Sequence, residues 1–322
     1  MPVLRTAFCL GLSVTLGAAA GSAAAQAYPN KPIRMLAPEA GGANEVAGRI
    51  IARAMAESMG QQFVIENRGA ASGVIAGEIT AHAPADGYTL LYYGSTIWLL
   101  PFLRDNVPFD PVKDLAPVSF ANTAPFFIFM NPSVPANNLR ELIALAKAKP
   151  GQLNYGSAGS GAATHLAAEM FKMVAGVDIT RIAYKGSSLA ATGLLAGEVQ
   201  LTFVSASGGL QYVKTGRLKA LAVASTHPSP LAPDVPTTAA AGLPNYLAAS
   251  TAGMFTTAKT PRAIVQKLNR EVVQALARPD VKEAFDRVAI EAVGSSPEEF
   301  AAFIKADMAK WSKVIKQAGI HE

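Results

Sequence analysis

The sequence predicts an α/β protein with two domains, each built on an open and largely parallel sheet. Three observations lead to this fold class. Apolar runs of strand length alternate with helical patterns. In both halves of the chain, a glycine-rich turn separates a strand from the helix that follows it. The 322 residues, with a leader removed, leave about 295, which suits two domains of about 100 to 200 residues each.

The first half alternates strictly, and each helix has its apolar residues on one face. The expected elements, in order, are a strand at 33–37, a turn at 38–42, a helix over 46–59 stopped by Gly60, a strand at 63–66, a turn at 69–73, a helix ending near 83 and a strand at 88–93. Strands joined through helices pair in parallel. Ligands in such sheets bind at the carboxyl ends of the strands.

The second half repeats this alternation and then turns helical. The expected elements are a helix at 139–149, strands at 153–155, 179–183, 201–204 and 218–224, and helices at 163–174, 189–196 and 208–215. After a proline-rich segment at 228–244 and an apolar run at 252–255, we expect only helices, at 261–277, 279–288 and 297 to about 318, each with Pro at or near its first turn. The second domain is therefore also α/β.

Residues 1–27 have the three-part layout of a secretory signal: Arg5, an apolar run over 7–16 and small residues to Ala27. The apolar run is about ten residues, short of the roughly 20 that a membrane-spanning helix needs. Ala25-Gln26-Ala27 predicts cleavage before Tyr28, although cleavage a few residues earlier also fits. Cys9, the single cysteine, leaves with the signal, so we expect no disulfide.

Several functions are disfavoured by what the sequence lacks. Lys and Arg are dispersed and aromatic residues make up 7%, so we expect no nucleic-acid binding. The four histidines share no metal-ligand spacing, and neither a zinc-protease motif nor a Gly-x-Ser-x-Gly elbow occurs. We therefore expect no metal, no cofactor and no enzymatic activity. Acidic residues near turns leave a paired-carboxylate mechanism open, but such loop acids are usually solvated; they are Glu39, Glu45, Glu66 and Asp86.

The glycine loop at 156–161 lies between a strand and a helix. It lacks Gly-Lys-Ser/Thr, and Thr164 stands where a dinucleotide fingerprint needs Gly or Ala. Its backbone N–H groups at a helix start still suit an anion such as a carboxylate; alternatively, the glycines only make a tight turn. The loop at 38–44 has the same form, with Asn44 as its expected N-cap. His165 either contacts a ligand or packs locally.

Ordered motifs along the chain resemble one family. They are Tyr28-Pro29-Asn30-Lys31-Pro32-Ile33-Arg34, Ala40-Gly41-Gly42, Glu66-Asn67-Arg68-Gly69, Asp86-Gly87-Tyr88-Thr89-Leu90-Leu91, Phe109-Asp110-Pro111-Val112-Lys113-Asp114-Leu115, Asn154-Tyr155-Gly156-Ser157-Ala158-Gly159, His165-Leu166, Tyr184-Lys185-Gly186, Asp234-Val235-Pro236-Thr237 and Pro297-Glu298-Glu299-Phe300. From Tyr28 to the C-terminus, the chain resembles the Bug family, the solute receptors of tripartite tricarboxylate transporters.

This resemblance implies a two-domain periplasmic-binding-protein (Venus flytrap) fold in which the chain crosses between domains twice, near Pro125 and near Ser250. Residues 28–125 plus 251–322 would form one domain, and residues 126–250 the other. It further implies a periplasmic, monomeric receptor that binds a small carboxylate and delivers it to membrane subunits of the transporter. The alternatives are a binding protein used for sensing or signalling and, third, an α/β hydrolase.

By position, four loops would line the cleft between the domains. Their residues are Ala40, Gly41, Gly42, Asn44, Ser95, Thr96, Ser157, Ala158, Gly159, Ser160, Gly161, His165, Phe203, Val204 and Ser205. The chain departs from the family pattern at Glu39, at Asn44-Glu45 in place of Thr-Asp, and at Val204 in place of an acid. Glu39 would favour a ligand with an amino group if it faces the cleft, and would have no effect if it faces solvent.

Overall fold

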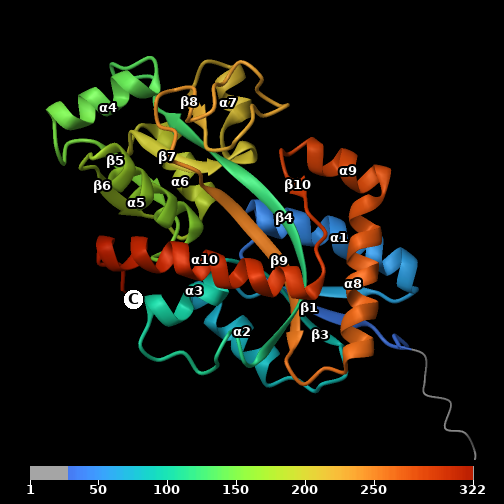
Figure 1. The fold of residues 1–322 in the computed structure, drawn as a ribbon. Helices are drawn as coiled ribbons and strands as arrows, with labels where there is room; N and C mark the ends of the chain where they lie inside the picture. Colours follow the sequence, from blue (N-terminus) through green and yellow to red (C-terminus); the bar gives the residue numbers. More distant parts are fainter. Residues whose placement is uncertain (1–27, 322) are drawn as a thin grey trace, which may run out of the picture.

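The computed structural model describes residues 28–321, apart from the side chains of residues 70 and 71 (Figure 1). The expected signal peptide, 1–27, lies outside the described residues. Two α/β halves are visible in Figure 1, joined by two long strands that run diagonally between them. Within 28–321, no helix combines the length and the apolar composition needed to cross a membrane.

The first half begins with strands paired in parallel in the order β2-β1-β3. Its elements are β1 (Ile33–Ala37), α1 (Ala43–Met59), β2 (Phe63–Asn67), the 3₁₀ turn η1 (Ala70–Gly73), α2 (Val74–Ala81), β3 (Thr89–Gly94) and α3 (Thr96–Leu103). Successive residues of β1 enter different cores on the two faces, Met35 on one and Leu36 on the other. The sheet is thus covered on both sides, as parallel sheets require.

The second half has the parallel order β7-β5-β6. Its elements are α4 (Leu139–Ala148), β5 (Asn154–Ser157), α5 (Ala163–Ala175), β6 (Thr180–Ala183), α6 (Ser187–Ala196), β7 (Leu201–Ser205), η2 (Ala206–Gly208), α7 (Leu210–Lys214) and β8 (Lys219–Val223). The expected alternation is confirmed here, with ends shifted by one or two residues. A short loop and then a helix follow each of β5 and β6, whereas β7 leads directly into η2.

Two strands connect the halves and were not expected as such. The strand β4 (Leu115–Met130) pairs antiparallel with β9 (Ala249–Thr257) as far as the pair Pro125↔Ala249. From Phe126 onward, β4 pairs instead with β7 and β8. One continuous path of strands results, and all of the pairs made by β4 are antiparallel, in contrast to the parallel pairing predicted.

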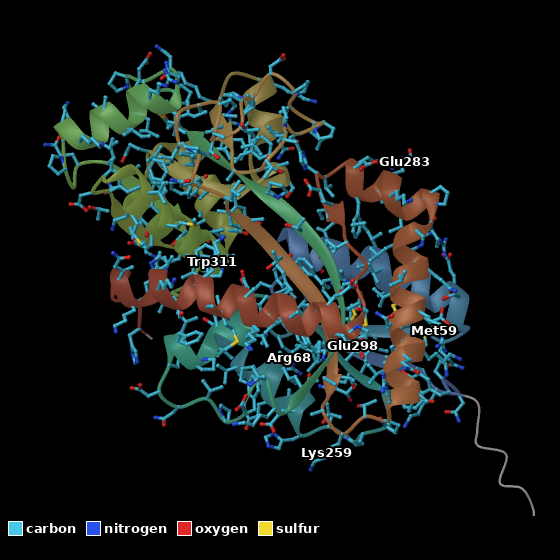
Figure 2. All side chains as sticks on the ribbon, viewed as in Figure 1. Met59, Arg68, Lys259, Glu283, Glu298 and Trp311 are labelled. Atoms are coloured by element: carbon cyan, nitrogen blue, oxygen red, sulfur yellow. The ribbon has the colours of Figure 1, made fainter. Side chains whose placement is uncertain are left out.

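The C-terminal part packs on the first half. It contains α8 (Arg262–Ala277), α9 (Pro279–Asp286), β10 (Glu291–Ala292) and α10 (Pro297–Ala318). The expectation of a wholly helical end was wrong, because β10 pairs with β4 through Glu291↔Thr123. The start of α10 is fixed by a capping box between Ser296 and Glu299. Trp311, labelled in Figure 2, is buried on this helix and donates from Nε1 to Asp307 at 3.0 Å.

Candidate functional site

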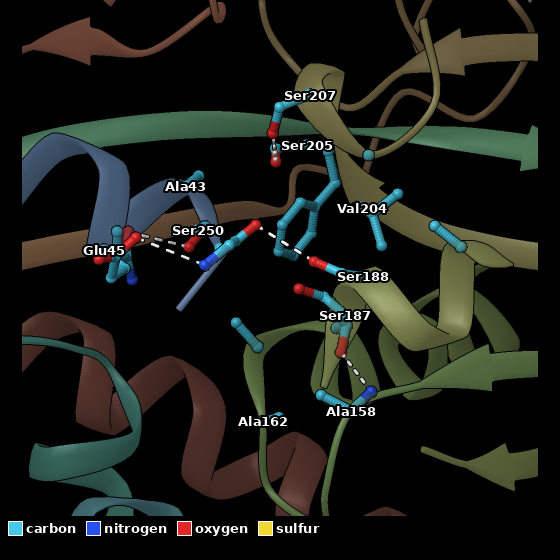
Figure 3. Close-up of a pocket in the computed structure, with 18 of the residues that line it drawn as sticks. Ala43, Glu45, Ala158, Ala162, Ser187, Ser188, Val204, Ser205, Ser207 and Ser250 are labelled. Carbon is cyan, nitrogen blue, oxygen red and sulfur yellow. Dashed lines mark hydrogen bonds between the residues drawn. The ribbon is translucent and has the colours of Figure 1, made fainter. Parts of the chain in front are cut away.

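A cavity of about 350 Å³ lies where the two halves face each other (Figure 3). Its volume falls at the lower end of the roughly 300 to 1,000 Å³ found for small-molecule pockets. One wall comes from the loop before α1 and from the start of that helix. The opposite wall comes from the starts of α5 and α6 and from the segment after β7. Strands β4 and β9 contribute Phe126 and Ser250 where they cross between the halves.

Three helices begin at this cavity: α1, α5 and α6. Their N-cap residues are Gly42, Ala162 and Gly186, and none of them makes a side-chain capping hydrogen bond. The first N–H groups of a helix have no acceptor within the helix, and the helix dipole makes that end positive. Converging uncapped starts therefore give the cavity donors and positive potential that suit an anion.

The side chains around these helix starts are mostly small and polar. Hydroxyl and amide groups come from Asn44, Thr164, Ser187, Ser188, Thr192, Ser205, Ser207, Gln211, Tyr212 and Ser250. Among the described residues that line the cavity, Glu45 is the single charged one. An anion bound here would rely on backbone N–H and hydroxyl donors, since the described lining offers no Lys, Arg or His.

Six of the expected site residues line the cavity: Gly41, Gly42, Asn44, Ala158, Val204 and Ser205. Asn44 is one of these six, but the expectation that it is the N-cap of α1 was wrong. It is the second residue of that helix, and Gly42 is the N-cap. The Asn44 side chain donates to the carbonyl oxygen of Thr251 at 3.1 Å and accepts from the Ser250 hydroxyl at 3.0 Å. It therefore ties α1 to β9 beside the cavity.

The glycine loop at 156–161 contributes less to the lining than expected, because a guanidinium holds its serines. Arg181 donates to Ser157 Oγ at 2.8 Å, to Ser160 Oγ at 3.0 Å and to the Ala158 carbonyl at 2.8 Å. Ser157, Gly159, Ser160 and Gly161 are thus outside the lining. The loop shapes the wall through its backbone instead of presenting its hydroxyls.

His165 is buried in the first turn of α5 and is not part of the lining. Its Nδ1 accepts the backbone N–H of Gly161 at 3.2 Å. Burial, with Arg181 and Lys172 nearby, lowers the pKa of His165 to about 3, so the ring is neutral at pH 7. Of the two interpretations left open by the sequence, this geometry matches local packing and capping.

The remaining expected residues do not line the cavity. Phe203 is fully buried in the core beneath β7, against Phe171, because successive strand residues point to opposite faces and its neighbour Val204 faces the other way. Ala40 is exposed in the loop before α1. Ser95 and Thr96 begin α3 and take no part in the lining.

Sequence reasoning missed most of the lining, including every residue that α6 contributes. The missed residues are Pro38, Ala43, Glu45, Phe126, Ala162, Ala163, Thr164, Ser187, Ser188, Ala191, Thr192, Leu195, Ser207, Gly208, Gln211, Tyr212 and Ser250. A signal for the α6 start was present, since Gly186 follows a strand and precedes a helix, as in the two loops that were recognised. We expected the acidic residues near turns to be solvated, and this was wrong for Glu45, which is 5% exposed.

The alternatives for Glu39 are resolved by its position. Glu39 is exposed, and its carboxylate packs against the α-carbon of Gly69. A Cβ at position 69 would come within 1.9 Å of the Glu39 carboxyl carbon. Glu39 takes no part in lining the cavity. The acidic residue that does is Glu45, the third residue of α1.

Comparison with known proteins connects this fold to one family. The family model described as the tripartite tricarboxylate transporter family receptor, TctC, matches residues 47–320. Protein BugT of Bordetella pertussis is 33% identical over 322 residues, which cover 99% of each chain. The structure of the periplasmic binding protein BugD has a TM-score of 0.83 at 30% identity, covering 92% of this chain and 100% of that one.

Two further solved structures are similar and carry bound acids. R. palustris Rpa4515 with adipate has a TM-score of 0.85 at 32% identity, covering 91% of this chain and 98% of that chain. MatC from Rhodopseudomonas palustris with bound malate has a TM-score of 0.80 at 27% identity, covering 89% and 100%. With its two α/β halves and its periplasmic-binding-protein fold, the chain belongs to the Bug-type receptors of the tripartite tricarboxylate transporter family.

Proposed function

We propose that the protein is a periplasmic receptor that captures a small carboxylate in this cavity and delivers it to the membrane subunits of a tripartite tricarboxylate-type transporter. The observation that carries the proposal is the convergence of three uncapped helix starts, α1, α5 and α6, on one polar cavity. Charge-assisted N–H bonds contribute on the order of 1.5 to 3 kcal/mol each, so three or four account for micromolar binding. Adipate and malate bound to two similar proteins support the ligand class.

The proposed division into residues 28–125 plus 251–322 and residues 126–250 fits the strand pairing. β4 exchanges β9 for β7 between Pro125 and Phe126, and β9 begins at Ala249 opposite Pro125. Both crossings therefore occur at the same level of the sheet. Because the two strands cross side by side, the halves can move relative to each other about a hinge at the pair Pro125 and Ala249, with the cavity between the halves.

A thermal-shift screen of mono- and dicarboxylates against residues 28–322 tests the ligand class. A ligand at 100 times its Kd stabilises the folded protein by about 2.7 kcal/mol, which gives a clear rise in Tm. If no acid raises the Tm and the protein instead hydrolyses esters or amides, the receptor proposal is wrong.

A pair of variants at Gly42 tests the site. This N-cap residue has extended backbone (φ −88°), and a Cβ there meets nothing within 4 Å. Asp and Asn are both favourable N-caps, so Gly42→Asp and Gly42→Asn should both fold. The added negative charge should make Gly42→Asp weaken acid binding by about tenfold or more, and Gly42→Asn should weaken it less. Equal affinities for the two variants would contradict the site.

Delivery to the transporter is tested in cells. Deleting the gene should abolish uptake of the radiolabelled acid identified in the screen, and the wild-type gene should restore it. The Gly42→Asp variant should restore uptake less well than Gly42→Asn. Unchanged uptake in the deletion strain would argue against a transport role.

A further inference from the structure

The helix α6 turns one face to the cavity, and the chemistry of that face changes along the helix. After Ser187 at the helix start, the residues that line the cavity are Ser188, Ala191, Thr192 and Leu195. Side chains at this spacing of three and four residues lie on one side of a helix. With a rise of about 1.5 Å per residue, Leu195 lies about 10 Å further along the helix than Ser188. The lining thus runs from hydroxyl groups at the start of α6 to an aliphatic side chain near its end.

The aliphatic end of this face continues onto β7. Val204, at the end of that strand, lines the cavity and belongs to a buried apolar cluster of the second half (Figure 3). Leu195 and Tyr212, which also line the cavity, pack against the same cluster. Because close-packed core side chains lie behind it, this surface is held in place before a ligand arrives. We refer to Ala191, Leu195 and Val204 as the apolar patch.

Several hydroxyl groups of the lining donate to the protein itself. Ser188 donates to the Gly41 carbonyl at 3.2 Å, and Thr192 donates to the Ser188 carbonyl at 3.1 Å. Ser250 donates to Asn44 Oδ1 at 3.0 Å. A hydroxyl group has one hydrogen, so these three groups can accept from a ligand but cannot donate to it while these bonds are made. They therefore offer a hydroxylated ligand fewer hydrogen bonds than their number suggests.

The apolar patch distinguishes between polar and apolar ligand bodies. A ligand hydroxyl placed against Leu195 or Val204 would lose its water, and a hydrocarbon side chain cannot replace that hydrogen bond. A methylene chain or a ring placed there has no such bond to lose. Its contact with the patch removes apolar surface from water on both sides, which favours binding.

We propose that the cavity selects acids with an apolar body, either a methylene chain or a ring, over acids whose body carries hydroxyl groups. A carboxylate of the ligand binds at the starts of α5 and α6, and the body lies along α6 on the apolar patch. Leu195 and Val204 are the residues that determine this specificity. This inference rests on the proposed function and names the substrate class of the same site.

Isothermal titration calorimetry with two matched pairs of acids tests the proposal. Adipate and D-glucarate share a six-carbon chain with two carboxylates, and cyclohexanecarboxylate and quinate share a six-membered ring with one carboxylate. Only the second acid of each pair carries hydroxyl groups on its body, so the carbon skeleton and the charge are constant within a pair. In each pair whose skeleton binds, the apolar acid should bind about tenfold or more tightly than the hydroxylated acid.

Two variants test whether the patch causes this preference. Leu195→Gln and Val204→Thr make the patch polar with side chains of similar size. Each should weaken binding of the apolar acid by about threefold to tenfold and should affect the hydroxylated acid less. Leu189→Gln is the matched control, because it makes the same change on the same helix at a leucine that is 51% exposed and outside the lining. This control should keep the wild-type preference.

The outcomes separate this inference from the proposed function. If in either pair the hydroxylated acid binds as tightly as its apolar partner, or more tightly, the inference is wrong and the carboxylate receptor stands. The same holds if both variants, with circular dichroism spectra like that of the wild type, keep the wild-type preference. It also holds if none of the four acids binds while another acid does.

Two outcomes remain. If neither variant folds, the matched pairs measured on the wild type decide the inference alone. If no acid binds at all, the proposed function and the inference are both overturned.

Discussion

The hydroxyl of Ser188 donates to the carbonyl oxygen of Gly41 at 3.2 Å, which joins the start of α6 to the loop before α1 across the cavity (Figure 3). A second bond of this kind runs from the Ser72 hydroxyl to the Ser160 carbonyl at 3.3 Å. Both connect segments that belong to opposite halves of the fold. Because neither involves a charged group, each is weak alone, and a ligand between the same walls adds to them.

The Ser188→Ala variant should bind the carboxylate ligand about threefold to tenfold more weakly than the wild type. A neutral hydrogen bond contributes about 0.5 to 1.5 kcal/mol, and its loss should appear mainly as faster ligand dissociation. Isothermal titration calorimetry and stopped-flow kinetics measure both quantities. Ser312→Ala, which removes a half-buried hydroxyl on α10 outside the cavity lining, should leave them unchanged. Wild-type dissociation kinetics in Ser188→Ala would show that this bond has no role in retaining the ligand.

Arg181→Lys should weaken ligand binding by about tenfold, although it keeps the positive charge. The planar guanidinium bonds three groups of the 157–160 loop at 2.8 to 3.0 Å, and an ammonium group cannot reproduce that fork. The loop would then hold the start of α5 less firmly. Hydrogen exchange of the loop amides should speed up in the same variant. Arg262→Lys, at a side chain that is 82% exposed, is the matched control; protected amides and full affinity in Arg181→Lys would contradict the prediction.

Local patterns predicted most of the elements because their causes are local. In α1, the buried residues Ala47, Ile51, Ala54 and Met55 follow the helical period, and Gly60 ends the helix with φ 66°. The pairing of β4 had no such signal. Its partner changes between Pro125 and Phe126, and β9 lies more than 120 residues further along the chain. A long-range antiparallel pair of this kind leaves no trace in the alternation of strands and helices.

The sequence predicted which loops form the site but not which of their side chains line it. As with β4, the missing information lies in contacts between residues distant in the sequence. Which hydroxyls face the cavity depends on partners distant in sequence: Ser157 and Ser160 are held by Arg181, 24 and 21 residues away. At the end of β7, a shift of one residue separates the core position of Phe203 from the cavity position of Val204. Glycine spacing identifies a helix start that can bind an anion, but it does not identify which side chains around that start face the cavity.

Gly161→Ala should destabilise the protein by about 1 to 3 kcal/mol, whereas Gly159→Ala should have little effect. Gly161 has φ 66°, and a Cβ there would come within 2.4 Å of Leu103 on the opposite half. Gly159 lacks a positive φ, and a Cβ there meets nothing within 4 Å. Urea unfolding followed by circular dichroism measures the difference. Equal midpoints for these two variants would mean that the loop can shift away from Leu103 at no cost.

His165 predicts a specific dependence of stability on pH. Its pKa is about 3 in the folded protein, against 6.5 as the ordinary value, because burial disfavours the charged ring. Between these values the unfolded chain binds a proton that the folded protein does not. The free energy of unfolding should therefore fall as the pH decreases from about 6.5 toward 3, by up to about 1.4 kcal/mol per pH unit from this group.

Replacing the ring isolates this contribution. In His165→Asn, the amide oxygen can accept the Gly161 N–H in place of Nδ1 but cannot take up a proton at these pH values. Although other groups titrate in both proteins, the difference in stability between wild type and variant should shift in favour of the variant as the pH falls below about 6.5. His82→Asn, at an exposed histidine on the turn after α2, should keep the wild-type profile. Parallel profiles for the wild type and His165→Asn between pH 6.5 and 4 would mean that the ring is protonated in the folded protein as readily as in the unfolded chain.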